Sequence, residues 1–264
     1  MMLSNRLWNR ALLRNASLPM RGLKLHEYQA GALLNSFQVP IPVGEVAFSA
    51  DEAHKIASGI PGGCVVKSQV LGGGRGLGHV KETGFQGGVH LVDDAAKAKS
   101  IASELIGNTL VTHQSGADGL PINSVYLVEK VNIAKEMYLS LTLDRAAGCP
   151  TFIYSPDGGM SIEDVAASNP ERIFKLPVPV SEGLDSAKLR QAAADLGIPE
   201  QADQVEDVLS KIYECFMKKD ADMVEINPLV LTKEGKVLCA DSKVTVDSNA
   251  LFRQKDLAAQ EDKS

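Results

Sequence analysis

A lysine and an arginine lie within a glycine-rich stretch and could hold phosphates. Residues 64–79 read CVVKSQVLGGGRGLGH, in which β-branched residues lead into a run of glycines. Lys67 falls in the expected strand and Arg75 in the loop, and glycines let backbone N–H groups approach an anion closely. Residues 79–92 look like further strand, so we expect a glycine-rich flap in a β-hairpin that covers phosphates from above. An ordinary glycine-rich surface hairpin is the alternative interpretation.

Two well-known phosphate-binding motifs do not match this loop. No Gly-Lys-Ser or Gly-Lys-Thr follows the glycines, which excludes a P-loop. Gly74 and Gly76 would need a third glycine at position 79 to form the dinucleotide-binding fingerprint, and His79 stands there instead. The sequence therefore predicts phosphate contacts through a different kind of loop.

A second group of polar residues indicates a metal site. In the stretch EINPLVLTKEGKVLCAD, residues 233–235 have the form of a three-residue hairpin loop with glycine last. Closure of the hairpin there places Asn227 opposite Asp241. Two residues further back, Glu225 lies opposite Lys243, on the same face of the hairpin. Carboxylate and amide oxygens suit Mg²⁺ held jointly with phosphates, whereas a surface hairpin with an exposed cross-strand ion pair is the alternative.

A third segment, residues 127–136, carries two carboxylates near the ends of expected strands. Glu129 ends one strand and Glu136 opens the next. A carboxylate at a strand end can accept hydrogen bonds from a ribose or from a base amine. Taken by itself, the segment favours the alternative, a solvated turn.

Composition narrows the functional class. The chain has 264 residues and a net charge of −6, which argues against nucleic acid as a main partner. No apolar run approaches the length of a membrane span, so we expect no membrane insertion. The four cysteines are scattered and form no Cys-x-x-Cys pair, which indicates neither a zinc site nor a disulfide framework.

Residues 1–22 differ in composition from the rest of the chain. They are rich in arginine with interspersed leucines, and no acidic residue occurs before Glu27. This pattern is typical of a mitochondrial transit peptide and lacks the continuous apolar core of a secretory signal. We therefore expect cleavage just before Leu23 and a location in the mitochondrial matrix. A disordered basic tail on a cytosolic protein is the alternative.

Hydrophobic periodicity predicts an α+β fold with two lobes. We expect a first lobe at 23–120, a second lobe at 121–256 and a polar tail at 257–264. The expected helices are 25–37, 49–58, 93–106, 162–167, 186–196 and 201–218. Besides the strand of the flap, the expected strands are 43–48, 125–129, 137–143, 151–154, 223–231 and 237–243.

The motifs, in this order, resemble an ATP-grasp domain, and more specifically the β subunits of succinyl-CoA synthetases (succinate–CoA ligases). The resemblance runs from about Leu23 to about Ala259. The matching stretches are LHEYQ at 25–29, VVKSQ at 65–69, GRG at 74–76, AKE at 134–136, SPDGGM at 155–160, NPER at 169–172, EINPL at 225–229 and NALFRQ at 249–254.

The resemblance implies a reaction of the tricarboxylic acid cycle. A nucleoside triphosphate (ATP or GTP), succinate and CoA interconvert with the diphosphate (ADP or GDP), phosphate and succinyl-CoA. Mg²⁺ is the implied metal, and the phosphoryl group passes through a histidine of a partner α subunit in a heterodimer. The family's fold implies two lobes that clasp the nucleotide beneath a glycine-rich flap.

The resemblance also implies roles for individual residues. Phosphates would be held by Lys67, Gly74, Arg75 and Gly76. Base and ribose would be surrounded by Gln29, Glu129, Val131, Asn132 and Glu136. Mg²⁺ would be held by Asn227 and Asp241. Glu225 would meet the α-subunit histidine, which makes Glu225 and Arg75 the expected catalytic residues.

Two departures from the family leave the function open. Leu77 follows Gly-Arg-Gly where the family often has lysine, which removes a positive charge near the phosphates. Family members also continue into a further α/β domain that we expect to be missing from this chain. Three hypotheses follow: a β subunit or its truncated form, a truncated Mg-nucleotide-binding module without complete catalysis, or a related ligase acting on another dicarboxylate such as malate. The choice between ATP and GTP stays open, although residues 88–91 and 165–169 favour the GTP type.

Overall fold

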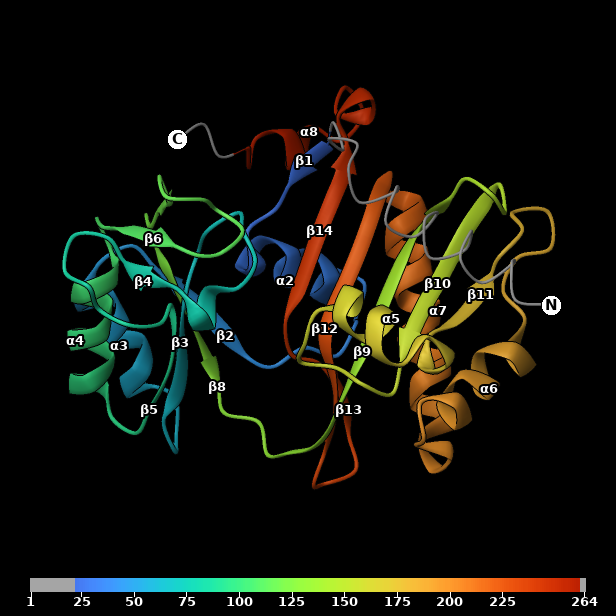
Figure 1. Cartoon of the computed structure of the whole chain (residues 1–264), viewed down its shortest axis with the longest axis horizontal. Helices are drawn as coiled ribbons and strands as arrows, with labels where there is room; N and C mark the ends of the chain where they lie inside the picture. Colours follow the sequence, from blue (N-terminus) through green and yellow to red (C-terminus); the bar gives the residue numbers. More distant parts are fainter. Residues whose placement is uncertain (1–21, 262–264) are drawn as a thin grey trace.

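The computed structural model describes residues 22–261 and shows two lobes side by side, each with its own sheet (Figure 1). The large lobe comprises residues 22–39 and 133–261, and the small lobe comprises residues 44–129. The expected transit peptide lies, except for Gly22, outside the described residues.

The large lobe is built on a seven-stranded antiparallel sheet. In spatial order its strands are β1 (Gly22–Lys24), β14 (Ser242–Asp247), β12 (Ala221–Thr232), β9 (Ile133–Asp144), β10 (Cys149–Ser155) and β11 (Phe174–Pro177), with β13 (Val237–Cys239) paired to β12. The helices of this lobe are α2 (Glu27–Ser36), α5 (Ile162–Ser168), α6 (Ser186–Asp195), α7 (Ala202–Lys218) and α8 (Lys255–Ala258).

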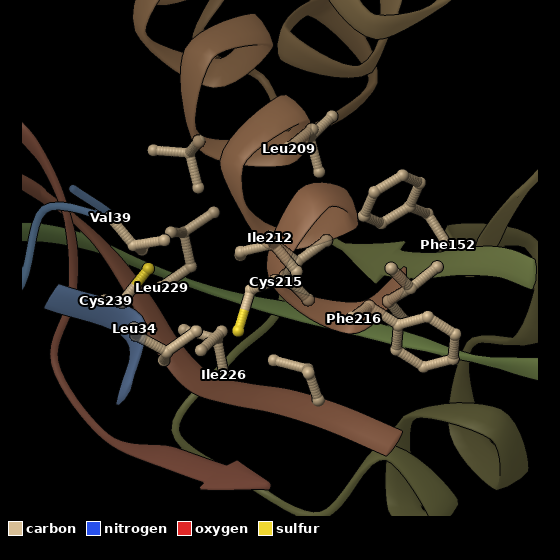
Figure 2. Packing of buried hydrophobic residues seen from close by; sticks show 14 of the residues in the cluster. Leu34, Val39, Phe152, Leu209, Ile212, Cys215, Phe216, Ile226, Leu229 and Cys239 are labelled. Carbon is tan, nitrogen blue, oxygen red and sulfur yellow. The ribbon is translucent and has the colours of Figure 1, made fainter. Parts of the chain in front are cut away.

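The core of the large lobe lies between the sheet and three of these helices, α2, α6 and α7. Figure 2 shows Leu209, Ile212 and Phe216 of α7 in one cluster with Ile226 and Leu229 of β12. The helix expected at 201–218 is confirmed, and its buried residues pack in this core.

The small lobe contains a four-stranded sheet and a three-stranded sheet. The first has the order β2 (Gly44–Ala47), β8 (Val125–Glu129), β3 (Cys64–Ser68) and β5 (Val89–Val92), and it is covered by α3 (Ala50–Ser58) and α4 (Ala95–Leu105). The second consists of β4 (His79–Val80), β6 (Thr109–Val111) and β7 (Leu120–Pro121). None of the helices in the described part of the chain is long and apolar enough to cross a membrane.

The lobes do not divide at residue 120 as we expected. Leu23 of β1 and Leu34 of α2 pack in the core of the large lobe, because β1 pairs with β14 at the edge of its sheet. Strand β8, which follows residue 120, lies between β2 and β3 in the small lobe. The chain therefore crosses between the lobes twice, at residues 40–43 and 130–132.

The flap also differs in part from the expected hairpin. Strands β3 and β5 pair as expected, with Lys67 opposite Val89. Residues 79–80 instead form β4, which pairs with β6 in the separate three-stranded sheet. The glycine-rich flap, residues 69–78, thus rises from β3 and is held on its far side by a second sheet.

The core of the large lobe generates a stability prediction. Leu209 is 1% exposed, so Leu209→Ala leaves a cavity and should lower the free energy of unfolding by about 2–5 kcal/mol. Urea denaturation measures the change. Leu77→Ala is the matched control, because Leu77 is 93% exposed and its truncation should change stability by less than about 0.5 kcal/mol. A loss below about 1 kcal/mol for Leu209→Ala would contradict the packing described here.

Candidate functional site

Four charged side chains meet between the two lobes. The small lobe provides Lys67 of β3 and Arg75, which opens a short 3-10 turn in the flap. The large lobe provides Glu27 from the first turn of α2 and Asp241 from the link between β13 and β14. Two cations from one lobe thus face two carboxylates from the other.

The contacts within this group are short and direct. Lys67 Nζ donates to Glu27 Oε1 at 2.6 Å and to the carbonyl oxygen of Ala240 at 3.0 Å. Arg75 donates from Nη1 to Glu27 Oε2 at 2.7 Å and from Nη2 to Asp241 Oδ2 at 2.6 Å. We call Glu27, Lys67, Arg75 and Asp241 the inter-lobe charge cluster.

Glu27 is the anchor of this cluster. Its side chain is only 6% exposed, and burial by itself raises the pKa of its carboxyl group. The Lys67 ammonium and the Arg75 guanidinium outweigh that effect and hold the pKa below its ordinary value. Glu27 is therefore ionised and bound to two cations at once.

Asp241 has a different environment. Its side chain is 32% exposed and contacts Arg75 of the small lobe. Removal from solvent and the nearby charge of Glu27 raise the pKa of its carboxyl group, and Arg75 and Lys67 oppose them. The same two cations cannot satisfy both carboxylates equally, so Asp241 is the member most in need of another positive charge.

Local backbone geometry explains how the flap presents Arg75. Gly74 has φ of +74°, a left-handed conformation that favours glycine, and a Cβ there would lie 2.9 Å from the His113 ring. Arg75 Nη1 also donates to the carbonyl oxygen of Ser68 at 3.1 Å, which ties the guanidinium back to its own strand. A Cβ on Gly76 would meet nothing within 4 Å, so the flap has open space at that residue.

The hairpin at residues 225–241, which we call the carboxylate hairpin, has the register expected from its turn at residues 233–235. The N–H of Thr232 donates to the carbonyl of Lys236 at 2.8 Å, and that of Asn227 donates to the carbonyl of Asp241 at 3.1 Å. Further back, Glu225 pairs with Lys243 across β12 and β14.

The Glu225 side chain of this hairpin is partly buried. Lys243 Nζ is 3.7 Å from Glu225 Oε2, and the Glu225 side chain is 23% exposed. Burial raises the pKa of the Glu225 carboxyl group, and Lys243 only partly offsets that effect. The buried Tyr138 of β9 also hydrogen-bonds the Glu225 carboxylate. Glu225 is therefore a carboxyl group that takes up a proton more readily than an exposed glutamate.

Asn227 supports a neighbouring loop. Its Oδ1 accepts from the N–H of Gly159 at 2.8 Å, and its Nδ2 donates to the carbonyl oxygen of Met160 at 2.8 Å. Gly159 has φ of +72°, and a Cβ on it would collide with the Glu136 carboxylate. The loop at 156–160 thus brings Asn227 and Glu136 to one region of the large lobe.

The backbones of Asn227 and Asp241 are hydrogen-bonded across the hairpin. A carboxylate with an amide oxygen is a typical protein contribution to a magnesium site shared with phosphates, so the two side chains stay the predicted metal ligands. Within residues 22–261, no group of three or more His, Cys, Asp and Glu side chains could hold a metal. An ion here would therefore need oxygens from a bound phosphate to complete its coordination.

Three of the expected base and ribose residues lie at the second crossing between the lobes. Glu129 Oε1 accepts from the N–H of Val43 at 2.8 Å, which joins the two crossings. Asn132 Nδ2 donates to Glu234 Oε1 at 3.0 Å, and its carbonyl accepts from the N–H of Lys233. Val131 lies half-buried between them.

Gln29 lies apart from these residues. Its Oε1 accepts from the N–H of His26 at the start of α2, and its Nε2 donates to the carbonyl oxygen of Gln260 at 3.1 Å. The side chain thus caps its own helix and fastens the C-terminal segment. Gln29 stays a predicted nucleotide contact, because hydrogen bonds within the chain do not test that role.

Sequence reasoning missed Glu27, which is the most deeply buried charge in the site. Its partner Lys67 is 40 residues away and Arg75 is 48 residues away, so no local spacing could reveal the contacts. The available signal was an acidic residue within the matching stretch LHEYQ, to which we assigned no role.

The chain is similar to known proteins over most of its length. A family model described as the ATP-grasp domain matches residues 24–231. The chain is 43% identical over 246 residues to "Succinate--CoA ligase [ADP-forming] subunit beta, mitochondrial" of Dictyostelium discoideum, covering 92% of this chain and 55% of that protein. It is 45% identical to the "Succinate--CoA ligase [ADP-forming] subunit beta" of Rhodopseudomonas palustris, covering 92% of this chain and 62% of that protein. The chain therefore spans somewhat more than half the length of these relatives.

Solved structures share the fold at low sequence identity. A dinucleotide-forming acetyl-coenzyme A synthetase 1 of Ca. Korarchaeum cryptofilum matches with a TM-score of 0.65 and 16% identity, covering 90% of this chain and 99% of that chain. ATP citrate lyase from Methanothrix soehngenii matches with a TM-score of 0.65 and 17% identity, covering 90% of this chain and 54% of that chain.

The raised pKa of Glu225 generates a pH-dependent stability prediction. A carboxyl group whose pKa is higher in the folded state destabilises the fold above its folded pKa, and this penalty disappears below its unfolded pKa. Glu225→Gln should therefore raise the free energy of unfolding at pH 7.5 and leave it unchanged at pH 3.5. Urea denaturation at the two pH values measures both differences.

The matched control is Glu45→Gln, which replaces an exposed glutamate of β2. It should change stability little at either pH. A Glu225→Gln protein that is less stable than wild type at pH 7.5 would contradict the environment assigned to this carboxyl group.

Proposed function

This chain belongs to the ATP-grasp family, and we propose that it is the nucleotide-binding part of a succinate–CoA ligase β subunit. In this function it interconverts succinate, CoA and a nucleoside triphosphate with succinyl-CoA, the diphosphate and phosphate. A histidine of an α subunit carries the phosphoryl group between the two half-reactions, so activity requires that partner.

The inter-lobe charge cluster is the observation that carries this proposal. Lys67 and Arg75 place two cations where a polyphosphate needs neutralisation, and Arg75 contacts the carboxylate of Asp241 at 2.6 Å. Phosphate-binding cations and a candidate metal ligand thus share one space between two lobes. The 42–45% identity to succinate–CoA ligase β subunits supports the same function.

Each residue has a physical role in the proposed reaction. Lys67, Arg75 and the backbone of Gly74 and Gly76 bind and orient the phosphates beneath the flap. Asp241 and Asn227 hold Mg²⁺, which supplies charge neutralisation at the phosphates when it is bound. Base and ribose lie against the second crossing, with Glu129, Val131, Asn132 and Glu136 as contacts.

Glu225 acts on the α-subunit histidine in this proposal. A partly buried carboxylate accepts a hydrogen bond from one ring nitrogen and so orients the other nitrogen toward the phosphate. Its raised pKa also lets it hold a proton during the transfer. Glu225 and Arg75 are therefore the proposed catalytic residues of this chain.

Location, nucleotide and substrate belong to the same proposal. A mitochondrial matrix location follows from the expected transit peptide, and the relative from Dictyostelium discoideum carries "mitochondrial" in its name. The relatives named above are ADP-forming, which supports ATP and ADP as the nucleotides. Residues 88–91 and 165–169 of the sequence instead favour the GTP type. A substrate panel of succinate, malate and itaconate separates the proposed ligase from one for another dicarboxylate.

Reconstitution with an α subunit tests the proposal. The purified chain should bind Mg-nucleotide by calorimetry and, together with an α subunit, form succinyl-CoA. Binding without a stable complex or product would favour the second hypothesis, a nucleotide-binding module that completes no catalytic cycle. No binding of either Mg-ATP or Mg-GTP would contradict both functions.

The metal assignment generates a prediction for Asp241. Asp241→Asn keeps the shape of the side chain and removes the charged ligand, so the gain in nucleotide affinity that Mg²⁺ provides should disappear. Calorimetric titration in Mg²⁺ and in EDTA measures that gain. Asp207→Asn, which alters an exposed ion pair on α7, is the control and should keep it. An undiminished Mg²⁺ effect in Asp241→Asn would rule out Asp241 as the ligand.

The role of Glu225 predicts a separation of binding from transfer. Glu225→Gln should lower the rate of α-subunit histidine phosphorylation by about 100-fold or more, because the amide cannot hold the proton. Nucleotide affinity should stay within about twofold, because Glu225 is not among the proposed nucleotide contacts. Rapid-quench phosphorylation assays and calorimetry measure the two effects. Equal losses in both would indicate that Glu225 acts on the nucleotide instead.

A further inference from the structure

We propose that Glu27 is a built-in counter-anion of the phosphate site. It binds both phosphate-binding cations while nucleotide is absent, competes with phosphates for them, and so makes the site prefer Mg²⁺-bound over metal-free polyphosphate. This inference rests on the proposed function, because it assumes that Lys67 and Arg75 bind phosphates.

The geometry of Glu27 is that of a substitute for a bound anion. Each carboxylate oxygen binds a different cation, with Oε1 at 2.6 Å from Lys67 Nζ and Oε2 at 2.7 Å from Arg75 Nη1. Two oxygens of a phosphate group would make the same pair of contacts. The position is fixed, because Glu27 belongs to the first turn of α2, where the helix dipole also favours a negative charge.

Glu27 takes one N–H donor from each of the two cations. A lysine ammonium has three N–H donors, and Lys67 uses one on Glu27 and another on the Ala240 carbonyl. An arginine has five, and Arg75 uses donors on Glu27, Ser68 and Asp241. These contacts use two of the three donors of Lys67 and three of the five of Arg75, so an arriving phosphate competes for them with Glu27 and the other acceptors.

The charge of the cluster explains the preference for the metal-bound form. Lys67 and Arg75 balance Glu27 and Asp241, so the cluster has no net charge when all four are ionised. A metal-free polyphosphate gains little from such a site and is repelled by two carboxylates. Mg²⁺ changes the balance, because it reduces the charge of the ligand and gives Asp241 a cation of its own.

Neutralising Glu27 should therefore weaken the preference for Mg²⁺-bound over metal-free polyphosphate. Glu27→Gln keeps the size of the side chain and leaves the cluster with one net positive charge. Coulomb attraction grows with the charge of the ligand, so metal-free polyphosphate gains more than its Mg²⁺ complex. The selectivity for the Mg²⁺-bound form should fall.

Calorimetric titration with inorganic tripolyphosphate tests this inference without depending on the base or on activity. In EDTA, Glu27→Gln should bind tripolyphosphate at least about tenfold more tightly than wild type. In excess Mg²⁺, the gain should stay below about threefold. Asp203→Asn is the matched control, because it neutralises another arginine-bound carboxylate, on α7, and should change neither affinity.

The outcomes separate this inference from the proposed function. Unchanged or weaker binding by Glu27→Gln in EDTA would overturn the inference and make Glu27 a supporting part of the phosphate site. Wild type that binds Mg-nucleotide in the same assay would keep the proposed function intact. Glu27→Asp provides a second variant should the amide impair folding. It withdraws the carboxylate by one methylene, and a gain of at least about threefold in EDTA is expected.

Discussion

Removing Lys67, Arg75 and Glu27 from water costs free energy that only close pairing with opposite charge offsets. In this chain the pairing is made across two lobes. The small lobe provides both cations, and the large lobe provides both carboxylates. The two lobes are therefore joined at their centre by an interaction that any anion or cation entering the space must rearrange. The same requirement makes the site sensitive to charge, since each added or removed ion changes the balance of the whole cluster.

The hairpin and the two crossings between the lobes position the residues around the inter-lobe charge cluster. The turn at residues 233–235 sets the register that brings Asp241 opposite Asn227. The two crossings are fastened to each other through Glu129 and to the hairpin through Asn132. The cluster, the hairpin and the crossings thus form one connected region at the boundary of the lobes. In the proposed function, this region would hold the phosphates, the metal and the base of one nucleotide.

Much of this region could be predicted from the sequence because its determinants are local. The hairpin register followed from a three-residue turn at residues 233–235. The lobe boundary could not be found in the same way, because β1 joins the large lobe by pairing with β14 at the other end of the chain. Glu27 was missed for the same reason. Gln29 is placed with the nucleotide by resemblance alone, and its hydrogen bond to the N–H of His26 caps the start of α2.

A crystal structure with Mg²⁺ and a non-hydrolysable nucleoside triphosphate would show whether the inter-lobe charge cluster is the phosphate site. We expect phosphates in contact with Lys67 and Arg75, a metal bound by Asp241 and Asn227, and the base against residues 129–132. The Arg75–Asp241 contact should be replaced by contacts to phosphate and metal. Nucleotide bound elsewhere, with all four members of the inter-lobe charge cluster still paired as they are here, would contradict it.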